Sequence, residues 1–328
     1  MLTLGKLRGL DSMAAANGTY SMLALDHRNS FAQLTAEMFS GNATWEQVVA
    51  EKERLARAMA GHATAVLMDP LFTAGPLVAS GAIPGAIGVV VAVERSGFDK
   101  SDGGRLNVLE PGWTVDAVKR MGADGVKLLV QYHPSEAAAS AQEDFVGKVA
   151  DACRDADIAL VLEPISYAPS GKKTDPAFKE ALPGLVAQIA KTFDPYADIL
   201  KLEYPLLDDA PFEDMVAACQ AVTDATRLPW VVLSGGVPFE DFMMQVRAAC
   251  EGGASGFLGG RAIWKEAMNI LDVDGRDDFL RRTAGPRIAA LRAISDASAT
   301  PWRDRPVARE ATRMVDGWHG TYAGGNQG

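Results

Sequence analysis

The sequence predicts an α/β fold, a single (β/α)8 TIM barrel with a C-terminal extension. Eight short apolar runs rich in Val, Ile and Leu alternate with stretches of helical periodicity. Successive runs end roughly 33 residues apart, which is the size of one strand and one helix. The runs are continuous rather than alternating, as in parallel strands that are covered on both faces. A doubly wound open sheet is the alternative.

Most of the predicted strands end at a polar residue or a glycine. In order they are residues 20–25, 65–68, 87–93, 126–130, 158–162, 199–202, 230–233 and 256–258. Apolar residues recur at three- and four-residue steps from Ala138 to Cys153 and from Phe239 to Cys250, so both segments are predicted helices. Residues 71–88, which contain several Gly and Pro, are predicted to form a loop with a short helix.

No break in composition divides the first part of the chain, so residues 1–295 are predicted to form one barrel domain. Residues 296–328 are rich in Arg, Gly and Pro and contain Trp302 and Trp318. We expect this tail to pack partly on the barrel. The alternative is that its tryptophans mark a subunit contact, since we expect a homo-oligomer.

The charge and the cysteine content indicate which classes of partner to expect and in which compartment the protein resides. Lys and Arg number 32 against 42 Asp and Glu, a net charge of −10 without a long basic run, so we expect no nucleic-acid partner and no membrane surface. Three widely spaced cysteines in Ala- and Val-rich stretches predict buried free thiols in a reducing compartment. Polar residues and glycines interrupt the N-terminal segment, so we expect a cytoplasmic location.

Two lysines lie inside apolar strands, near the strand ends from which barrel enzymes project their catalytic groups. Lys127 lies in the fourth run, Lys201 in the sixth, and Glu163 closes the fifth. Strand alternation places Lys201 inward together with Ile199 and Glu203. A second ammonium and a dry wall lower the pKa of an inward lysine, and Glu163 can then transfer protons. The pattern predicts Schiff-base chemistry on a carbonyl substrate; a structural ion pair is the alternative.

The last two strands predict an anion site, because small residues follow both of them where barrels commonly bind phosphate. Glycines let backbone N–H groups approach an anion, a serine hydroxyl can donate a hydrogen bond, and an arginine can donate two. The predicted substrate-binding residues here are Ser234, Gly235, Gly236, Gly259, Gly260 and Arg261.

The first strand ends in three polar residues, Asp26, His27 and Arg28, that are predicted to line the mouth of the barrel. Asp26 can accept a hydrogen bond from a sugar hydroxyl, and Arg28 can balance charge or meet an anion. A salt-bridged loop is the alternative. Lys172 and Lys173, in the loop after the fifth strand, can bring cations to a second anionic group or remain solvated.

Metal and nicotinamide chemistry are not expected. The histidines are His27, His62, His133 and His319, and no two have metal-ligand spacing. His27 and His133 both lie near strand ends, so a pairing between them stays open. The glycine pairs lack the Gly-x-Gly-x-x-Gly spacing of dinucleotide-binding units. We therefore expect no cofactor and no metal.

Taken together and in order, these motifs make the chain resemble the class I aldolases of the tagatose-1,6-bisphosphate aldolase family, and within it the sulfofructosephosphate aldolases. The resemblance rests on Leu25-Asp26-His27-Arg28, Val126-Lys127-Leu128-Leu129, Leu162-Glu163-Pro164, Leu200-Lys201-Leu202-Glu203, residues 229–237 and residues 253–262. The sequence departs from the family at His27, where Gln is common, and at Gly235, where close relatives have Ser. Both departures lie where substrate is recognised.

The resemblance implies a metal-independent aldolase that cleaves a phosphorylated ketose, of the tagatose 1,6-bisphosphate or sulfofructose 1-phosphate type, to dihydroxyacetone phosphate and a three-carbon aldehyde. It implies Lys201 as the Schiff-base lysine, Glu163 as its proton-transfer partner and Lys127 as the second lysine, with Ser234 and Arg261 in the anion site. The alternatives are a sugar-phosphate isomerase or epimerase and a phosphosugar-binding regulator without turnover.

Overall fold

Eight parallel strands close into a barrel in the order β1-β10-β9-β8-β7-β6-β3-β2. The computed structural model describes the whole chain except residues 1, 40, 102, 207–209, 312–313 and 323–328. The barrel strands are β1 (Tyr20–Ala24), β2 (Ala65–Met68), β3 (Gly88–Ala92), β6 (Gly125–Tyr132), β7 (Ala159–Ser166), β8 (Ile199–Leu202), β9 (Trp230–Leu233) and β10 (Gly256–Gly259). Each predicted run overlaps one of these strands, which confirms the predicted fold.

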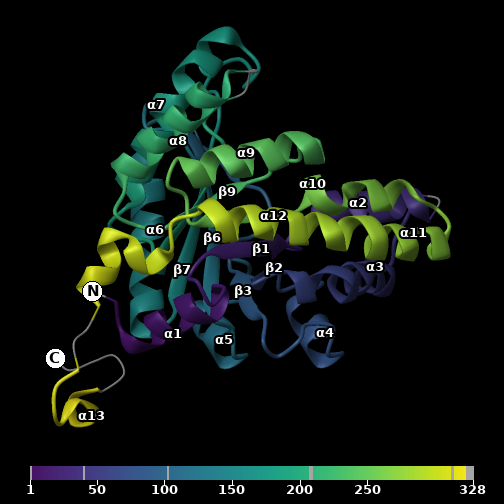
Figure 1. Ribbon diagram of the computed structural model, residues 1–328, viewed down its shortest axis with the longest axis horizontal. Coiled ribbons are helices and arrows are strands. Elements are labelled where there is room, and N and C mark those ends of the chain that lie inside the picture. The colour runs from purple at the N-terminus through teal and green to yellow at the C-terminus, as the bar shows by residue number, and fades with distance from the viewer. Residues whose placement is uncertain (1, 40, 102, 207–209, 312–313, 323–328) are drawn as a thin grey trace.

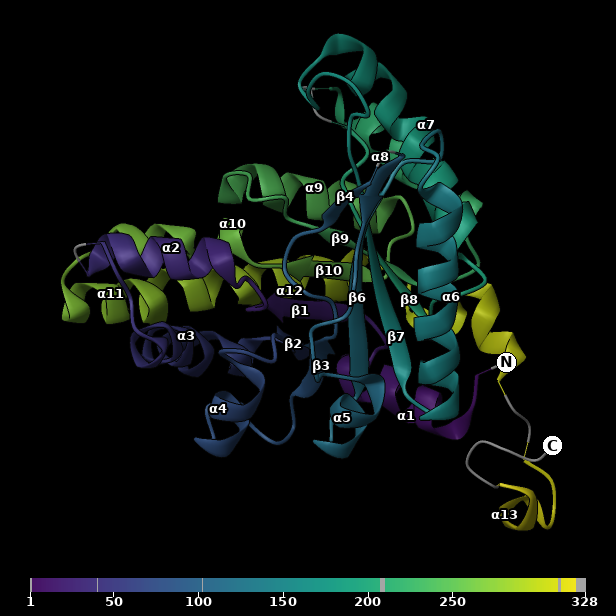
Figure 2. The same ribbon diagram turned by 180° about the vertical axis from the view of Figure 1, so that it is seen from behind.

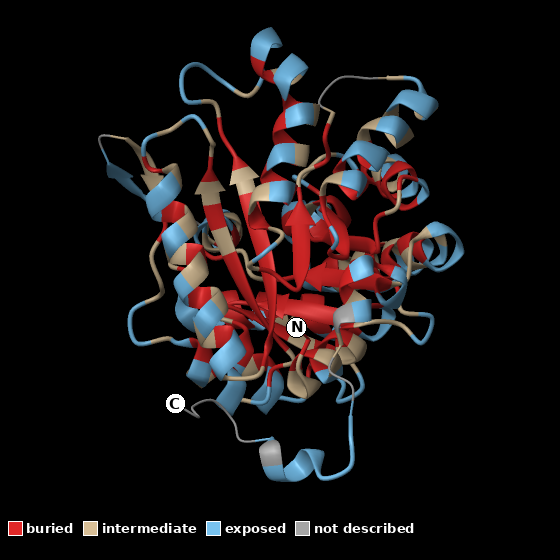
Figure 3. Cartoon of the chain, turned by 90° about the vertical axis from the view of Figure 1, so that its left-hand side faces the viewer, coloured by how far each residue is buried: buried red, intermediate tan, exposed pale blue. Residues whose placement is uncertain are grey.

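The barrel strands are buried almost throughout, as Figure 3 shows by their red colour. Helices cover their outer faces, so both faces need apolar side chains. β6 and β7 run past the apolar stretches predicted for them, because their pairing continues from Gly125 and Ala159 as far as Tyr132 and Ser166. Glu163 therefore lies inside β7 rather than at its end.

Helices surround the barrel (Figure 1), and two of them are those that periodicity predicted. The longer ones are α1 (Leu4–Met13), α2 (Asn29–Met38), α3 (Trp45–Met59), α6 (Ala139–Asp155), α7 (Pro176–Phe193), α8 (Phe212–Ala225), α9 (Phe239–Glu251) and α12 (Gly285–Ser298). The short ones are α4 (Ala74–Ala79), α5 (Val115–Arg120), α10 (Arg261–Trp264), α11 (Val273–Phe279) and α13 (Trp318–Thr321). The predicted helices are α6 and α9, and α4 is the short helix expected between β2 and β3.

Helix α1 and the β4–β5 hairpin were not predicted. Helix α1 packs against β3, β6 and β7 at the end of the barrel where the strands begin, and its buried Lys6 pairs with Asp198 at 2.8 Å. The hairpin of β4 (Asp99–Ser101) and β5 (Gly104–Leu106) follows β3 and packs beside β6 (Figure 2). Its short polar strands carry no apolar alternation, so the sequence pattern does not predict them.

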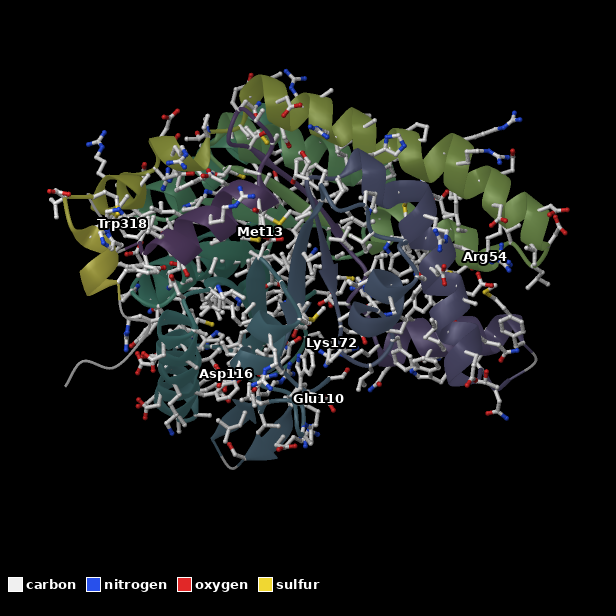
Figure 4. All side chains as sticks on the ribbon, turned by 90° about the horizontal axis from the view of Figure 1, so that it is seen from below. Met13, Arg54, Glu110, Asp116, Lys172 and Trp318 are labelled. Atoms are coloured by element: carbon white, nitrogen blue, oxygen red, sulfur yellow. The ribbon has the colours of Figure 1, made fainter. Side chains whose placement is uncertain are left out.

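The C-terminal tail packs partly on the barrel, and one of its two tryptophans is buried there. Helix α12 runs across the predicted boundary at residue 295 and ends at Ser298. Beyond it Trp302 is fully buried, whereas Trp318 is 40% exposed and lies at the edge of the molecule (Figure 4). Burial of Trp302 leaves Trp318 as the tail tryptophan that can reach a partner.

All three cysteines are buried and free, as predicted. Among the described residues, no helix is both long enough and apolar enough to cross a membrane.

Candidate active site

A cavity of about 550 Å³ opens at the C-terminal ends of the barrel strands. It contains most of the predicted site residues: Asp26, His27, Arg28, Lys127, Glu163, Lys201, Ser234, Gly235, Gly260 and Arg261 all line it. Six basic and four acidic side chains line its wall. The cavity is therefore locally basic in a chain whose net charge is −10.

Strand alternation arranges the lining in two layers. The inner layer holds Lys127 of β6, Glu163 of β7 and Lys201 of β8. An outer layer lies nearer the mouth. It holds Gln131, four residues after Lys127 on β6, and Glu203, two residues after Lys201. The inward orientation of Lys201 and Glu203 follows the register predicted from the sequence.

Lys127 is held by three carboxylates and stays an ammonium. Its Nζ lies 3.0 Å from Asp26, 2.9 Å from Glu94 and 3.0 Å from Glu163. Burial by itself would lower the pKa of Lys127, but the charges of Asp26, Glu163 and Glu94 outweigh it and raise the pKa well above its ordinary value. Lys127 is thus a fixed cation rather than a nucleophile.

Lys201 contacts a single carboxylate among the described residues, that of Glu163, at 2.8 Å. Both side chains are buried, with 5% and 6% of the residue surface exposed. Burial would raise the pKa of Glu163, but the charges of Lys127 and Lys201 prevail and lower it. Lys201 thus makes one ion pair with a carboxylate where Lys127 makes three.

Glu94 links Lys127 to Arg28. It was not among the site residues predicted from the sequence. Its carboxylate accepts hydrogen bonds from Lys127 at 2.9 Å, from Arg28 at 2.9 Å and from the backbone N–H of Leu129 at 3.1 Å. The available signal was its position at the end of the third apolar run. Arg28 also lies 3.6 Å from Glu110, so its guanidinium balances buried carboxylates.

His27 is neutral in the folded protein. Burial and the cations Arg261, Lys201 and Lys52 lower its pKa to about 3, and the nearby Asp26 carboxylate offsets them only in part. The ring stands edge-on to Trp264 with 5.3 Å between centroids. His133 packs instead near Tyr167, at 6.1 Å, so the open pairing of the two histidines is not formed.

The predicted anion site lies where β9 and β10 end. Gly260 donates its N–H to the Ser234 hydroxyl at 3.4 Å, and a Cβ at Gly260 would lie 2.8 Å from the His27 ring. Arg261 makes no ion pair within the described part of the chain and lines the cavity, so its guanidinium is available to an anion. Gly235 has φ +57°, a left-handed backbone that favours glycine.

Two predicted glycines lie behind the cavity instead of lining it. A Cβ on Gly259 would lie 2.7 Å from the Phe242 ring of α9, so this glycine allows the helix to pack closely on β10. A Cβ on Gly236 would lie 3.5 Å from the Arg261 guanidinium, so Gly236 supports that side chain. Of the two loop lysines, Lys173 lines the cavity and pairs with Glu203, while Lys172 is exposed to solvent.

The inner layer combines the groups that imine chemistry needs. A buried amine can attack a carbonyl, a carboxylate in contact with it can take and return protons, and a fixed ammonium can stabilise an oxyanion. The amine and the carboxylate both come from neighbouring strands, and the anion site lies on the next two strands along the barrel.

The family model and two curated relatives that match this chain are all aldolases. The family described as DeoC/LacD family aldolase matches residues 20–266. The chain is 30% identical to a tagatose 1,6-diphosphate aldolase of Streptococcus agalactiae over 93% of its own length and 99% of the relative. It is 28% identical to tagatose 1,6-diphosphate aldolase 2 of Enterococcus faecalis over 94% of its length and 99% of the relative.

Solved structures share the fold. An archaeal fructose 1,6-bisphosphate aldolase has a TM-score of 0.59 and 20% identity, and the match covers 88% of this chain and 98% of that one. A fructose-bisphosphate aldolase of Plasmodium falciparum has a TM-score of 0.66 and 11% identity, with coverage of 89% and 94%. At this identity the likeness extends to the barrel architecture.

Proposed function

The chain belongs to the DeoC/LacD family of aldolases, which makes it a carbon–carbon lyase, and we propose that it is a Schiff-base enzyme acting on a phosphorylated ketose. The products would be dihydroxyacetone phosphate and a three-carbon aldehyde. The observation that carries the proposal is the buried contact of 2.8 Å between Lys201 and Glu163, with Lys127 fixed as a cation beside them. The names of the relatives, tagatose 1,6-diphosphate aldolases, support this substrate class.

The reaction begins with the Lys201 amine. Its proton passes to Glu163, and the neutral nitrogen attacks the C2 ketone of the open-chain sugar to form a carbinolamine. Glu163 then returns the proton to the carbinolamine hydroxyl, which leaves as water and gives an iminium. The charge next to Glu163 is conserved, because an iminium replaces an ammonium. The ion pair seen at rest therefore suits the intermediate as well.

Cleavage uses the iminium as the electron acceptor. Glu163 takes the proton of the C4 hydroxyl, the C3–C4 bond breaks, and its electrons form the enamine while the aldehyde leaves. Protonation of the enamine at C3 and hydrolysis of the imine release dihydroxyacetone phosphate and restore Lys201. No oxidant or reductant is consumed. Asp26 accepts a hydrogen bond from Lys127 at 3.0 Å, and it would accept another from a substrate hydroxyl.

The phosphate next to the ketone would lie at the ends of β9 and β10. The Arg261 guanidinium, which makes no ion pair with the described residues, the Ser234 hydroxyl and the Gly235 backbone support this assignment. The negative phosphate gains charge-assisted hydrogen bonds there, and the ketone carbon then faces β8, the neighbour of β9 that carries Lys201.

The test is a cleavage assay on tagatose 1,6-bisphosphate, fructose 1,6-bisphosphate and sulfofructose 1-phosphate, with release of triose as the readout. K201M should abolish cleavage, and E163Q should lower kcat about 100-fold or more, as expected for loss of a general acid–base. K148M, at an exposed lysine of α6, is the matched control. A chelator should leave the rate unchanged.

Three results would contradict the proposal. Interconversion of sugar phosphates without cleavage would indicate an isomerase or epimerase. Tight binding of these compounds by the wild-type protein without turnover would indicate a regulator. Loss of activity on chelation would indicate a metal enzyme.

A further inference from the structure

The outer layer of the cavity has no role in the steps above. It holds Gln131 on β6, flanked by Arg95 from the loop after β3 and by Lys173 from the loop after β7. β3 and β7 are the two neighbours of β6 in the barrel, so these three side chains form one stretch of the wall. Both cations are paired, Arg95 with Asp99 and Lys173 with Glu203, so the neutral amide of Gln131 is the group of these three that is left to donate hydrogen bonds to an anion.

The side-chain amide of Gln131 is oriented by Arg105. The Arg105 guanidinium donates to Gln131 Oε1 at 2.9 Å. A guanidinium has only donors, so the oxygen of the amide must face Arg105 and the nitrogen must face away from it. Gln131 Nε2 finds no acceptor among the described residues, and the residue lines the cavity. Its two N–H groups are therefore left for a ligand.

Arg105 is itself firmly held. Its guanidinium stacks on the rings of Phe98, at 4.5 Å, and Tyr167, at 4.1 Å. The backbone of Gln131 is fixed too, because its N–H donates to Asn107 Oδ1 at 2.7 Å and its carbonyl accepts from Gln142 Nε2 at 3.1 Å. Asn107 and Gln142 are both buried. The hairpin that carries Arg105 is thus tied to the strand that carries Gln131.

The position of β6 decides which end of a substrate it can meet. β6 lies four strands from β10 in either direction around the barrel, directly across from it. The substrate phosphate assigned to the ends of β9 and β10 would therefore place the other end of the sugar chain toward β6. The cleaved bond lies between these two ends.

The geometry points to Gln131, oriented by Arg105, as the specificity-determining residue that donates hydrogen bonds to an anionic group at the distal end of the ketose. Arg95 and Lys173 lie on either side of it, each paired with a carboxylate, Asp99 and Glu203 respectively. Gln131 binds the half of the substrate that leaves as the aldehyde, and Arg105 is its positioning residue. The inference rests on the proposed aldolase function and on the placement of the first phosphate at β9 and β10.

The test compares a ketose 1,6-bisphosphate with the same ketose 1-phosphate, which lacks the distal anion. Q131L should raise KM for the bisphosphate about tenfold, the loss expected for hydrogen bonds to a charged acceptor, and leave KM for the monophosphate within about twofold. Trapping of dihydroxyacetone phosphate with borohydride should proceed equally in wild type and Q131L, because this half-substrate has no distal end. That arm also reports that Q131L is folded.

Equal changes in KM for the two ketoses, or no change for either, would overturn the inference. The proposed function fails differently, since a wild-type protein that traps no dihydroxyacetone phosphate would refute it whatever Q131L does. K100A, at an exposed residue of the same hairpin, is the control and should leave both KM values unchanged.

The role of Arg105 is tested by coupling. R105M should reproduce the selective rise in KM for the bisphosphate, and R105M should add nothing further in the Q131L background, because it acts through Gln131. R105K keeps a donor and should recover part of the loss. Additive effects of R105M and Q131L, or an equal effect of R105M on both ketoses, would show a merely structural role.

Discussion

Lys127 and Lys201 both contact Glu163, from the strands on either side of β7, but they contact different numbers of carboxylates. This difference gives the two lysines different roles in the proposed reaction. Lys127 is surrounded by Asp26, Glu94 and Glu163, so it remains charged, while Lys201 contacts Glu163 alone. The sequence predicted that Lys201 faces inward near Glu163, and the family resemblance implied Lys127 as the second lysine of the site. It could not predict which one stays an ammonium, because the contact between Glu94 and Lys127 joins residues 33 positions apart in the chain.

At the same scale, His27 should make the stability of the protein depend on pH. Its pKa is about 3 in the folded state against an ordinary value of 6.5, so between these values the unfolded chain binds a proton that the folded chain does not. Stability should therefore fall as pH drops from 6.5, by about 1.4 kcal/mol per pH unit from this residue. Urea unfolding between pH 6.5 and 4.5 measures this slope.

H27Q should remove that contribution and flatten the slope over the same range, whereas H62Q, at an exposed histidine, serves as the control for loss of an imidazole. Equal slopes in wild type and H27Q would contradict a neutral His27.

At the scale of elements, α3 is joined to β2 by a buried ion pair. Lys52 Nζ lies 2.6 Å from Asp69 and 2.8 Å from the carbonyl oxygen of Leu25, and both charged side chains are fully buried. This contact holds the helix against the ends of β1 and β2, next to Asp26. Burial lowers the pKa of Lys52, but Asp69 opposes this shift.

K52M should destabilise the protein by about 3–5 kcal/mol, because it leaves the Asp69 carboxylate buried without its partner. The exposed pair of Arg57 and Glu53 on the same helix is the matched control, and R57A should change stability by less than about 1 kcal/mol. Urea midpoints at neutral pH measure both. A loss in K52M no larger than that in R57A would refute a structural role for the buried pair.

The elements themselves were largely predictable, for a physical reason. Strands covered on both faces must be apolar along their length, and amphipathic helices such as α6 and α9 must repeat at three- and four-residue steps. The β4–β5 hairpin was not predictable, because Asp99–Ser101 is exposed and needs no apolar pattern. Arg105 in β5 and its hydrogen-bond partner Gln131 in the outer layer were missed with it.

On the scale of the whole molecule, the tail completes the end of the barrel where the strands begin. Trp302 is buried, and Arg305 donates hydrogen bonds to the carbonyl oxygens of Thr223, Thr226 and Leu228. These contacts lie at the opposite end of the barrel from the cavity. This part of the tail therefore contributes to stability and lies away from the proposed chemistry.

W302A should cost about 3–5 kcal/mol of unfolding free energy, as truncation of a large buried ring does. W318A should cost less than about 1 kcal/mol, since Trp318 is 40% exposed. Denaturation of both variants, with kcat on a cleaved ketose as a second readout, separates stability from catalysis. A loss of kcat in folded W302A would show that the tail does take part in the reaction.

The whole molecule also explains why an acidic chain can take an anionic substrate. Its net charge is −10, yet six basic side chains against four acidic ones line the cavity that opens across the barrel mouth from β10 to β6. In the proposed reaction the inner layer would support the imine, and the two sides of the mouth would bind the two ends of the sugar. Each function follows from a strand position that the closed barrel fixes.

The most direct test of the account is to treat the protein with dihydroxyacetone phosphate and borohydride and to map the modified peptide by mass spectrometry. The account predicts one stable adduct, located on Lys201, and none in K201M. An adduct on Lys127, or active enzyme that forms no adduct at all, would contradict it.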